Sequence, residues 1–600
     1  MISITKTICK AESLIDIAPL GKATQSSLSK WSKPNDAQRA VTDIGNANFA
    51  FHTNKEQNPW WQLTLDKPRC IEYIILHNRK DACKEKSRKL TVELFDGEEY
   101  IKIYDGDLLF DAEPDGLPLV LPCKYPKEIK LIKIVSQINE YFHLSKVNAL
   151  AKHHQLTFIA MRSDGFGERL KAILNAMVLS ENFDGRFLFH WFGMSDNKHH
   201  AIVEVDEIFS ENFINKFHID RTKLNKMKLI DLMDIAKSST WIVSEYIKEH
   251  DAIIVQQNIS AQLLKDARVD IDFANRYKEV FNEIELSESL EYVKTYANSI
   301  QLREHPVAIH LRAGDIIYGI HRIMGDYTRK VVSFSIAEKL IRDLLQQGYS
   351  PVLFGQDEKL LEYFKDKFGV MLSCELSNQS FSITQQAFFD IVLMSRCEQI
   401  FAGTSGFATV ASWIGGCQLI DPFRKFTKEE SLEIIDLAFK TQKFDDRISS
   451  LQKAFACWSY FYIYGEKCAT NKKLWKFLNL AIKYDSENDF YYLILACSFY
   501  NGKRIEDAEK ILYERFLIAD KQIYSIIKVL SRPGYLGKVL TISLYIDGIK
   551  PYAKLGHPMA ALCMAICKKA LGNNDSYVYF KELYLKNRSE KYSIFDKYIT

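Results

Sequence analysis

The chain has 600 residues, and at roughly 150 residues per domain this length predicts about four domains. Hydrophobic residues make up 47% and charged residues 26%, a globular balance that excludes a largely disordered chain. The net charge of +3 provides no overall attraction for nucleic acid, so no nucleic-acid partner is expected.

The sequence contains no candidate membrane segment, because no stretch approaches the roughly 18 apolar residues of a span. Charged residues also interrupt residues 1–20, which lack the unbroken apolar centre of a secretion signal. The expected location is therefore the cytoplasm, and peripheral association with an inner membrane stays open.

Residues 1–150 show short alternating patterns that are typical of β-strands. Apolar and polar residues alternate over residues 61–65, 72–76, 90–94 and 129–135, and turn residues lie between these stretches. The pattern predicts an antiparallel β-sandwich.

Residues 151–447 follow a rhythm of strand, loop and helix. A buried strand over residues 156–161 leads through a loop at 163–167 into an amphipathic helix over 168–183, and further strands are predicted at 307–311, 351–354 and 399–402. The pattern predicts a parallel α/β architecture with two doubly wound halves, 151–300 and 301–447, that face a cleft.

Residues 448–600 carry helical patterns without strands. Helices are predicted over residues 475–484, 489–499 and 505–513, and a weaker echo covers 560–583. Their spacing resembles a tetratricopeptide helix pair, which implies a surface for a protein partner. An all-α cap that covers the preceding domain is the alternative.

The hexapeptide His310-Leu-Arg-Ala-Gly-Asp315 follows a buried strand, where open α/β sheets bind ligands. Arg312 offers a planar fork of donors that suits a diphosphate. His310 can donate a hydrogen bond, Gly314 lets the backbone approach a ligand, and Asp315 can orient Arg312 or accept a proton. A strand-end salt bridge is the alternative interpretation.

This hexapeptide resembles the first signature of the GT-B glycosyltransferases that use GDP-fucose, the α1,2-, α1,6- and protein O-fucosyltransferases. The resemblance implies that Arg312 holds the β-phosphate of the departing nucleotide. Ala313 stands where the family has a second Arg, which leaves the donor sugar open between fucose and a heptose. The other donor-binding residues that it implies are Gly165, Phe166, Gly167, Gln356, Asp357, Thr404, Ser405 and Gly406.

Transfer from a nucleotide sugar requires neutralisation of the charge that grows on the leaving diphosphate. The sequence has Asp-x-Asp pairs at residues 105–107 and 270–272, but neither follows a convincing α/β strand, so no metal and no cofactor are expected. Arg312 and the 403–406 loop would take the place of a metal. Asp164, Glu168 and Asp315 are the candidates for the base. The histidine pairs at 153–154 and 199–200 are interpreted as solvated surface residues.

The N-terminal region has a resemblance of its own. Phe51-His52-Thr53, residues 58–65 and Asn78-Arg-Lys-Asp81 resemble an F-type lectin within the discoidin (coagulation factor 5/8 C) class. Such lectins hold fucose with a His and two Args, which implies His52, Arg79 and, as the second cation, Arg88, with Lys86 nearby. A degenerate module that only docks onto the enzyme is the alternative.

Together these features predict a glycosyltransferase that moves a sugar from a GDP-activated donor onto a bacterial surface polysaccharide, such as a capsule or lipopolysaccharide. The alternatives are a non-catalytic carbohydrate-binding or scaffold protein and a protein O-glycosyltransferase whose helical domain selects the acceptor.

Overall fold

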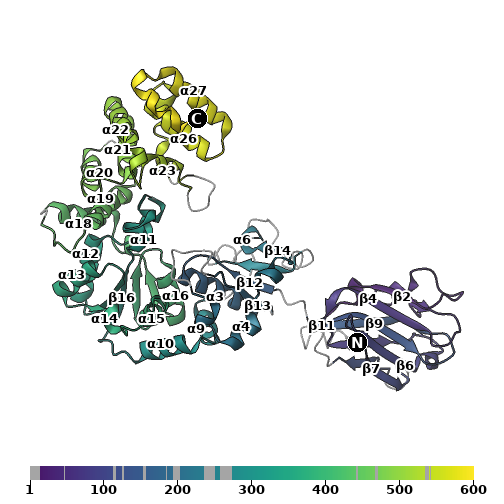
Figure 1. Ribbon diagram of the computed structural model, residues 1–600. Coiled ribbons are helices and arrows are strands. Elements are labelled where there is room, and N and C mark those ends of the chain that lie inside the picture. Colours follow the sequence, from purple (N-terminus) through teal and green to yellow (C-terminus); the bar gives the residue numbers. More distant parts are fainter. Residues whose placement is uncertain are drawn as a thin grey trace. The chain divides into compact units, whose positions relative to one another are not determined.

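The computed structural model describes residues 14–600 except for 43, 46, 112–115, 124–127, 153–156, 184, 194–202, 236–249, 257, 259–272, 324, 441–442, 466–470, 534–539 and 541. The chain folds into two compact units (Figure 1). The first comprises the residues up to Thr157 with Ser180–Arg186, and the second comprises Phe158–Leu179 and Phe187–Thr600.

The first unit is an antiparallel β-sandwich, as the alternation of its sequence predicted. Its larger sheet has the order β2 (Lys22–Gln25), β4 (Trp60–Arg69), β9 (Ile129–Ser136), β6 (Lys89–Phe95), β7 (Tyr100–Asp107). Its smaller sheet has the order β1 (Leu14–Asp16), β11 (Lys146–Lys152), β5 (Tyr73–His77), β8 (Leu119–Pro122). A short ribbon pairs β3 (Phe51–His52) with β10 (His143–Leu144).

The core of the sandwich lies between its two sheets. Leu63 of β4 and Ile74 of β5 are fully buried in the same cluster, because alternate residues of each strand point to the same face. Trp61 is also fully buried, and its indole N–H donates to the carbonyl oxygen of Ala37 at 3.0 Å. Trp61 is therefore a core residue.

The second unit contains two separate sheets whose described pairings are all parallel. One has the order β13 (Arg186–His190), β12 (Thr157–Met161), β15 (Ala252–Val255), β14 (Leu229–Asp231). The other has the order β18 (Met371–Leu372), β17 (Ser350–Gly355), β16 (Pro306–Leu311), β19 (Gln399–Ala402), β20 (Gln418–Ile420). The parallel strands were predicted, whereas the assignment to the GT-B class stays a prediction.

Helices connect these parallel strands, as parallel pairing requires. Those that follow strands of the first sheet are α3 (Phe166–Asn182), α4 (Glu211–Phe217), α5 (Arg221–Leu224) and α6 (Leu232–Ile235). Those around the second are α11 (Gly314–Ile317), η5 (Ile320–Ile323), η6 (Gly325–Lys330), α12 (Phe334–Gln346), α13 (Glu358–Phe368), α14 (Ser373–Leu376), α15 (Ile383–Ser395), α16 (Gly406–Gly415), α17 (Pro422–Lys425) and α18 (Lys428–Lys440). The helices α9 (Phe273–Asn282) and α10 (Glu288–Ser299) pack against α16 and α15 of the second half.

The C-terminal region is helical, as predicted, and over its described residues the helices follow α18 without an intervening strand (Figure 1). They are α19 (Ser450–Tyr464), α20 (Lys472–Tyr484), α21 (Asp489–Asn501), α22 (Ile505–Leu517), α23 (Ile526–Ser531), α24 (Ser543–Ile546), α25 (Lys550–Lys554), α26 (Pro558–Ala570) and α27 (Asn574–Asn587). The resemblance to tetratricopeptide repeats stays a prediction.

The second α/β half and the helical region share a single hydrophobic core. One cluster of buried side chains extends from Val307 in β16 through Trp458 in α19 to Ile599. Phe439 of α18 packs edge-to-face on Phe477 of α20, with their ring centroids 5.8 Å apart. This continuity favours the interpretation of the helices as a cap over the α/β core.

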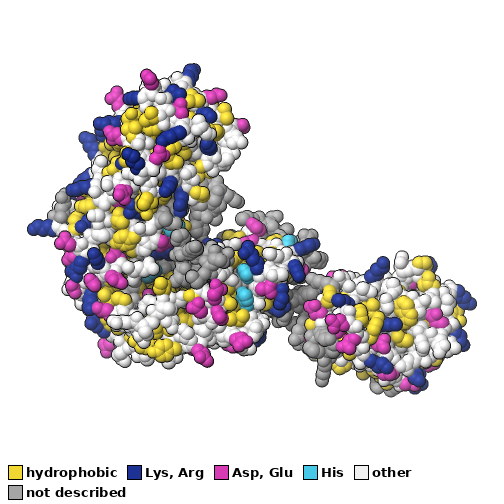
Figure 2. All heavy atoms as spheres, in the orientation of Figure 1, with side chains coloured by type: hydrophobic (Ala, Val, Ile, Leu, Met, Phe, Trp, Pro, Cys, Tyr) yellow, Lys and Arg dark blue, Asp and Glu magenta, His cyan; other side chains and the backbone are white. Residues whose placement is uncertain are grey.

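The visible surface carries charges of both signs, interspersed without a large patch of one sign (Figure 2). Within the described residues, no helix is both long enough and apolar enough to cross a membrane. Residues 270–272 and both histidine pairs singled out above lie outside the described residues.

Candidate functional site

The first candidate site surrounds His52 at the end of β3. Its imidazole contacts three aromatic rings, with centroid distances of 5.1 Å to Trp31, 5.3 Å to Phe49 and 5.2 Å to Tyr141. The large side chain of Trp31 is 50% exposed, so one edge of this aromatic cluster faces solvent. An exposed aromatic residue beside a buried polar one is the usual composition of a ligand contact.

Nδ1 of His52 lies 3.0 Å from the carbonyl oxygen of Thr53 and 3.0 Å from the Ser29 hydroxyl. The carbonyl oxygen can only accept, so in the tautomer that makes this hydrogen bond Nδ1 carries the proton and Nε2 is an acceptor. Burial lowers the pKa of His52 below its ordinary value, and the nearby charges of Arg79 and Lys86 lower it further. The ring is therefore neutral at pH 7.

Two cations flank this acceptor. The Arg79 guanidinium lies 5.1 Å from the centroid of the Phe49 ring and donates from Nη2 to Asp81 at 2.8 Å. The Lys86 ammonium lies 5.1 Å from the centroid of the Tyr141 ring and pairs with Glu140 at 3.0 Å. The cluster thus presents an imidazole, two cations that each have a carboxylate partner, and aromatic faces.

The electrostatics of the His52 ring indicate Lys86 as a candidate for the second cation, while Arg88 stays a prediction. Arg88 ion-pairs with Asp107, and both side chains are about half exposed, at 48% and 52%. The charge that acts on the His52 ring besides that of Arg79 belongs to Lys86. Sequence spacing alone did not show whether Lys86 or Arg88 lies nearer to His52. The 3-10 helix Lys84–Ser87 determines this, and it is seen only in the folded backbone.

Sequence reasoning also missed His143, which lies opposite His52 in the pairing of β3 with β10. Its ring is fully buried and 5.3 Å from that of His52, Nδ1 lies 3.2 Å from the Ser87 hydroxyl, and Nε2 has no hydrogen-bond partner. Burial lowers the pKa of His143 to about 3, and Arg79 is the next cause. No periodicity of the sequence marked this residue.

The second candidate site is a cavity of about 680 Å³ in the second unit, at the carboxyl ends of β19 and β20. Charged side chains of both signs, hydroxyls and three aromatic residues line it. The lining residues are Glu168, Lys171, Asn258, Tyr277, Tyr327, Lys330, Ala402, Gly403, Thr404, Ser405, Thr409, Trp413, Leu419 and Asp421.

The structure brings two of the predicted loops together at this cavity. Glu168, Thr404 and Ser405 all line it. A Cβ atom on Gly167 would lie 2.8 Å from the backbone of Gly406, so the start of α3 lies directly against the start of α16. Gly165 and Phe166 belong to the same loop but are not lining residues.

Arg312 lies beside the cavity and is not among its lining residues. Its Nη2 donates to both carboxylate oxygens of Asp315, at 3.1 and 3.2 Å, which matches the salt bridge that the sequence left as an alternative. His310 stacks on Phe407 at 6.4 Å, and its buried Nδ1 has no partner. Burial, followed by the Arg312 charge, lowers the pKa of His310 to about 4, so this ring is neutral.

The predicted nucleoside loop is largely engaged in structural contacts. One oxygen of Asp357 caps α13 by accepting from the backbone N–H of Leu360 at 3.2 Å. The other accepts from Tyr318 and, at 2.8 Å, from Gln452 of α19. These contacts give Asp357 a structural role, and its contact with a nucleotide stays a prediction. Gln356 is exposed and lies against Gly314.

The N-terminus of α16 points at the cavity and can hold an anion. The Ser405 side chain lines the cavity, is 2% exposed, and its hydroxyl has no hydrogen-bond partner. The first backbone N–H groups of a helix have no intrahelical acceptor and carry partial positive charge. A buried hydroxyl beside them therefore completes a cradle for phosphate oxygens.

The aspartate pair at 105–107 is engaged in ion pairs, since Asp105 pairs with Lys102 and Asp107 with Arg88. Within the described ranges no group of three His, Cys, Asp or Glu side chains lies close enough together to hold a metal ion.

Comparison with known proteins identifies the first unit. Residues 22–140 match the F5/8 type C domain, so the chain carries a discoidin-like domain at its N-terminus. No curated protein is significantly similar to the chain.

Solved structures are similar over the same region. A fucose binding module from Streptococcus pneumoniae is 23% identical over 23% of this chain and 95% of its own, with a TM-score of 0.20. A fucolectin from Morone saxatilis (striped bass) is 20% identical over 23% of this chain and 49% of its own, with a TM-score of 0.20. A family 32 carbohydrate-binding module from C. perfringens, in complex with galactose, is 15% identical over 23% of this chain and 98% of its own, with a TM-score of 0.20.

Proposed function

We propose that the first unit binds a carbohydrate at the His52 cluster. The observation that carries this proposal is the cluster of aromatic rings around His52, whose ring also lies within reach of the charges of Arg79 and Lys86. The F5/8 type C match supports the same class of function.

The chemistry of the cluster suits a sugar. A sugar hydroxyl can donate to Nε2 of His52 and accept from the guanidinium or ammonium beside it, and charge-assisted hydrogen bonds of this kind are the stronger ones. The aromatic edge formed by Trp31 and Tyr141 suits the apolar face of a sugar ring. L-Fucose, which the F-type lectin resemblance implies, is the first ligand to test.

Isothermal titration of the full chain with L-fucose, D-galactose and D-mannose tests this proposal. We expect H52A and K86A each to weaken binding by about tenfold or more, because each removes a hydrogen bond of a buried or charged group. R88A is the matched control and should bind as the wild type does. Equal affinity in H52A and the wild type would refute the assignment.

A second candidate function, glycosyl transfer from a GDP sugar, is favoured by the composition of the cavity. Glu168 lines it and could act as the base for an acceptor hydroxyl, and the N-terminus of α16 with Ser405 could hold the diphosphate. Arg312 at the end of β16 would stabilise the charge of the departing nucleotide, without a metal. A polysaccharide acceptor would accord with a sugar-binding unit on the same chain.

The test is donor turnover with labelled GDP sugars and separate glycan and peptide acceptor pools. R312A should lower kcat by about 10²–10³ while the melting temperature stays unchanged. Unchanged turnover would remove the central assignment, and label on peptide alone would favour a protein O-glycosyltransferase. A chain that binds sugar but never a nucleotide would be a carbohydrate-binding protein only.

A further inference from the structure

The charge of Arg312 is already balanced within its own segment. Asp315 accepts from its guanidinium, and Asp315 also lies 3.6 Å from Nε2 of His321. A diphosphate carries at least two negative charges, so a guanidinium that is already paired neutralises it only in part. A further cation at the cavity is therefore needed.

Lys330, at the end of η6, is in the right place to supply this charge. Its side chain lines the cavity together with Ser405 at the start of α16. Its ammonium lies 4.6 Å from the centroid of the Tyr327 ring, and the charged groups that face it are Arg312, Glu168, Asp164 and Asp315. Burial, and then the Arg312 charge, lowers the pKa of Lys330.

The backbone holds Lys330 against the phosphate-binding loop. The N–H of Thr404 donates to the carbonyl oxygen of Arg329 at 2.9 Å. A Cβ atom on Gly403 would lie 2.4 Å from the same oxygen and 2.7 Å from the carbonyl carbon of Lys330, so only glycine allows this approach. The loop and the end of η6 are therefore packed directly against each other.

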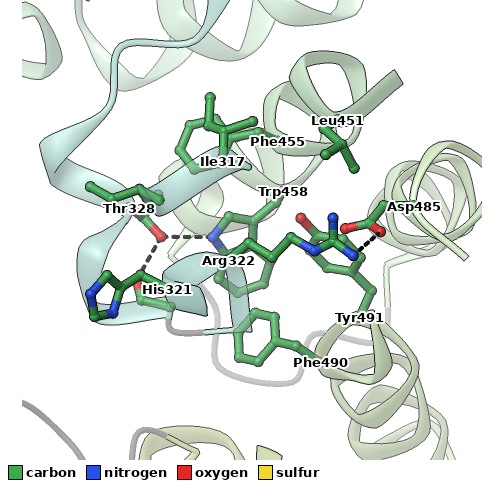
Figure 3. Close-up of a pocket in the computed structure, with 12 residues that line it drawn as sticks. Ile317, His321, Arg322, Thr328, Leu451, Phe455, Trp458, Asp485, Phe490 and Tyr491 are labelled. Carbon is green, nitrogen blue, oxygen red and sulfur yellow. Dashed lines mark hydrogen bonds and ion pairs between the residues drawn. The ribbon is translucent and has the colours of Figure 1, made fainter. Parts of the chain in front are cut away.

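The helical region fixes η6 from its other side (Figure 3). The indole N–H of Trp458 in α19 donates to the Thr328 hydroxyl at 2.7 Å, and that hydroxyl donates to the carbonyl oxygen of Gly325 at 2.6 Å. Beside it, Arg322 of η5 pairs with Asp485 at 3.4 Å. The segment that carries Lys330 is thus held between α16 and the helical cap.

We propose that Lys330, one of the two lysines that line the cavity, binds the diphosphate of the nucleotide donor opposite the N-terminus of α16. This inference rests on the proposed glycosyl transfer and names a residue that the sequence did not indicate. It also gives the helical region a role in positioning that residue.

Isothermal titration of the full chain with GDP, guanosine and pyrophosphate tests the inference. K330M should weaken the binding of GDP and of pyrophosphate by about ten- to hundredfold, because a charge-assisted contact is lost. Guanosine affinity should not change, which separates a phosphate contact from a structural effect. K330R should restore most of the affinity, and K554M, on exposed α25, is the matched control.

If K330M binds GDP as tightly as the wild type does, the Lys330 assignment is overturned and the proposed transfer stays intact. A wild type that binds neither GDP nor pyrophosphate overturns both. If K330M lowers the melting temperature, K330R decides the matter, because a charge requirement predicts rescue and a packing requirement does not.

Discussion

At the scale of single residues, the buried histidines of the sandwich report on its pH dependence. His143 is fully buried, and its pKa is lowered to about 3, first by burial and then by Arg79. In the unfolded chain the same group takes up a proton below about pH 6.5. Between pH 6.5 and about 3 the unfolded state therefore binds more protons than the folded state. The contribution of His143 to the free energy of unfolding of the first unit is consequently highest above pH 6.5 and declines as the pH falls.

We predict that the first unit loses up to about 1.4 kcal/mol of stability per pH unit from this residue as the pH falls below 6.5. This loss of stability is measured by hydrogen exchange of peptides from β9 in the wild type and in H143Q at the same pH. The intrinsic exchange rate of these peptides is the same in both proteins and therefore cancels in the comparison. The difference in stability between the wild type and H143Q should shrink as the pH falls from 6.5 to 5. A difference that stays constant over this range would contradict the prediction.

At the scale of elements, the contact between α19 and η6 depends on one buried hydrogen bond. Trp458 and Thr328 are 3% and 1% exposed, so neither group can exchange its partner for water. We predict that W458F destabilises the second unit by about 1–2 kcal/mol, measured by urea unfolding with near-UV circular dichroism.

The matched control for this change is W475F, because the indole nitrogen of Trp475 has no hydrogen-bond partner to lose. A double-mutant cycle with T328V should show a coupling energy of at least about 0.5 kcal/mol, as expected for residues in direct contact. Additive effects of W458F and T328V would show that the hydrogen bond does not join the two elements.

At the scale of the whole molecule, the shared core makes the helical region part of the second unit. Ser449 and Gln452 contact Tyr318 and Asp357 of the α/β half, and Phe477 packs against Phe439. A chain that ends at residue 447 would expose this apolar face to water.

We predict that deletion of residues 448–600 leaves the second unit loosely packed, with strong binding of a hydrophobic dye and no near-UV signal from that unit. The first unit should keep its fold and its sugar binding, because its core belongs to a separate cluster. Deletion of residues 1–157 is the matched control and should leave the second unit folded. A well-packed chain 1–447 would show that the helices are an independent module.

The order of secondary structure along the chain follows from the sequence alone, because its causes are local. Alternation over residues 61–65 and the buried run at 399–402 predicted strands β4 and β19, and the helices at 475–484 and 505–513 were found with ends shifted by a few residues. The His52 and Arg79 pair was also identified from sequence, since a recognisable segment carries each residue.

Only the tertiary structure decided which side chains meet. The charge of Lys86 acts on the ring of His52, and Lys330 lines the cavity that Arg312 only borders. Residues far apart in sequence are brought together by strand pairing and by the packing of loops against helix ends, and neither has a local signature. The same holds for the core that joins residues 307–599, because apolar periodicity marks a buried face but not the surface that covers it.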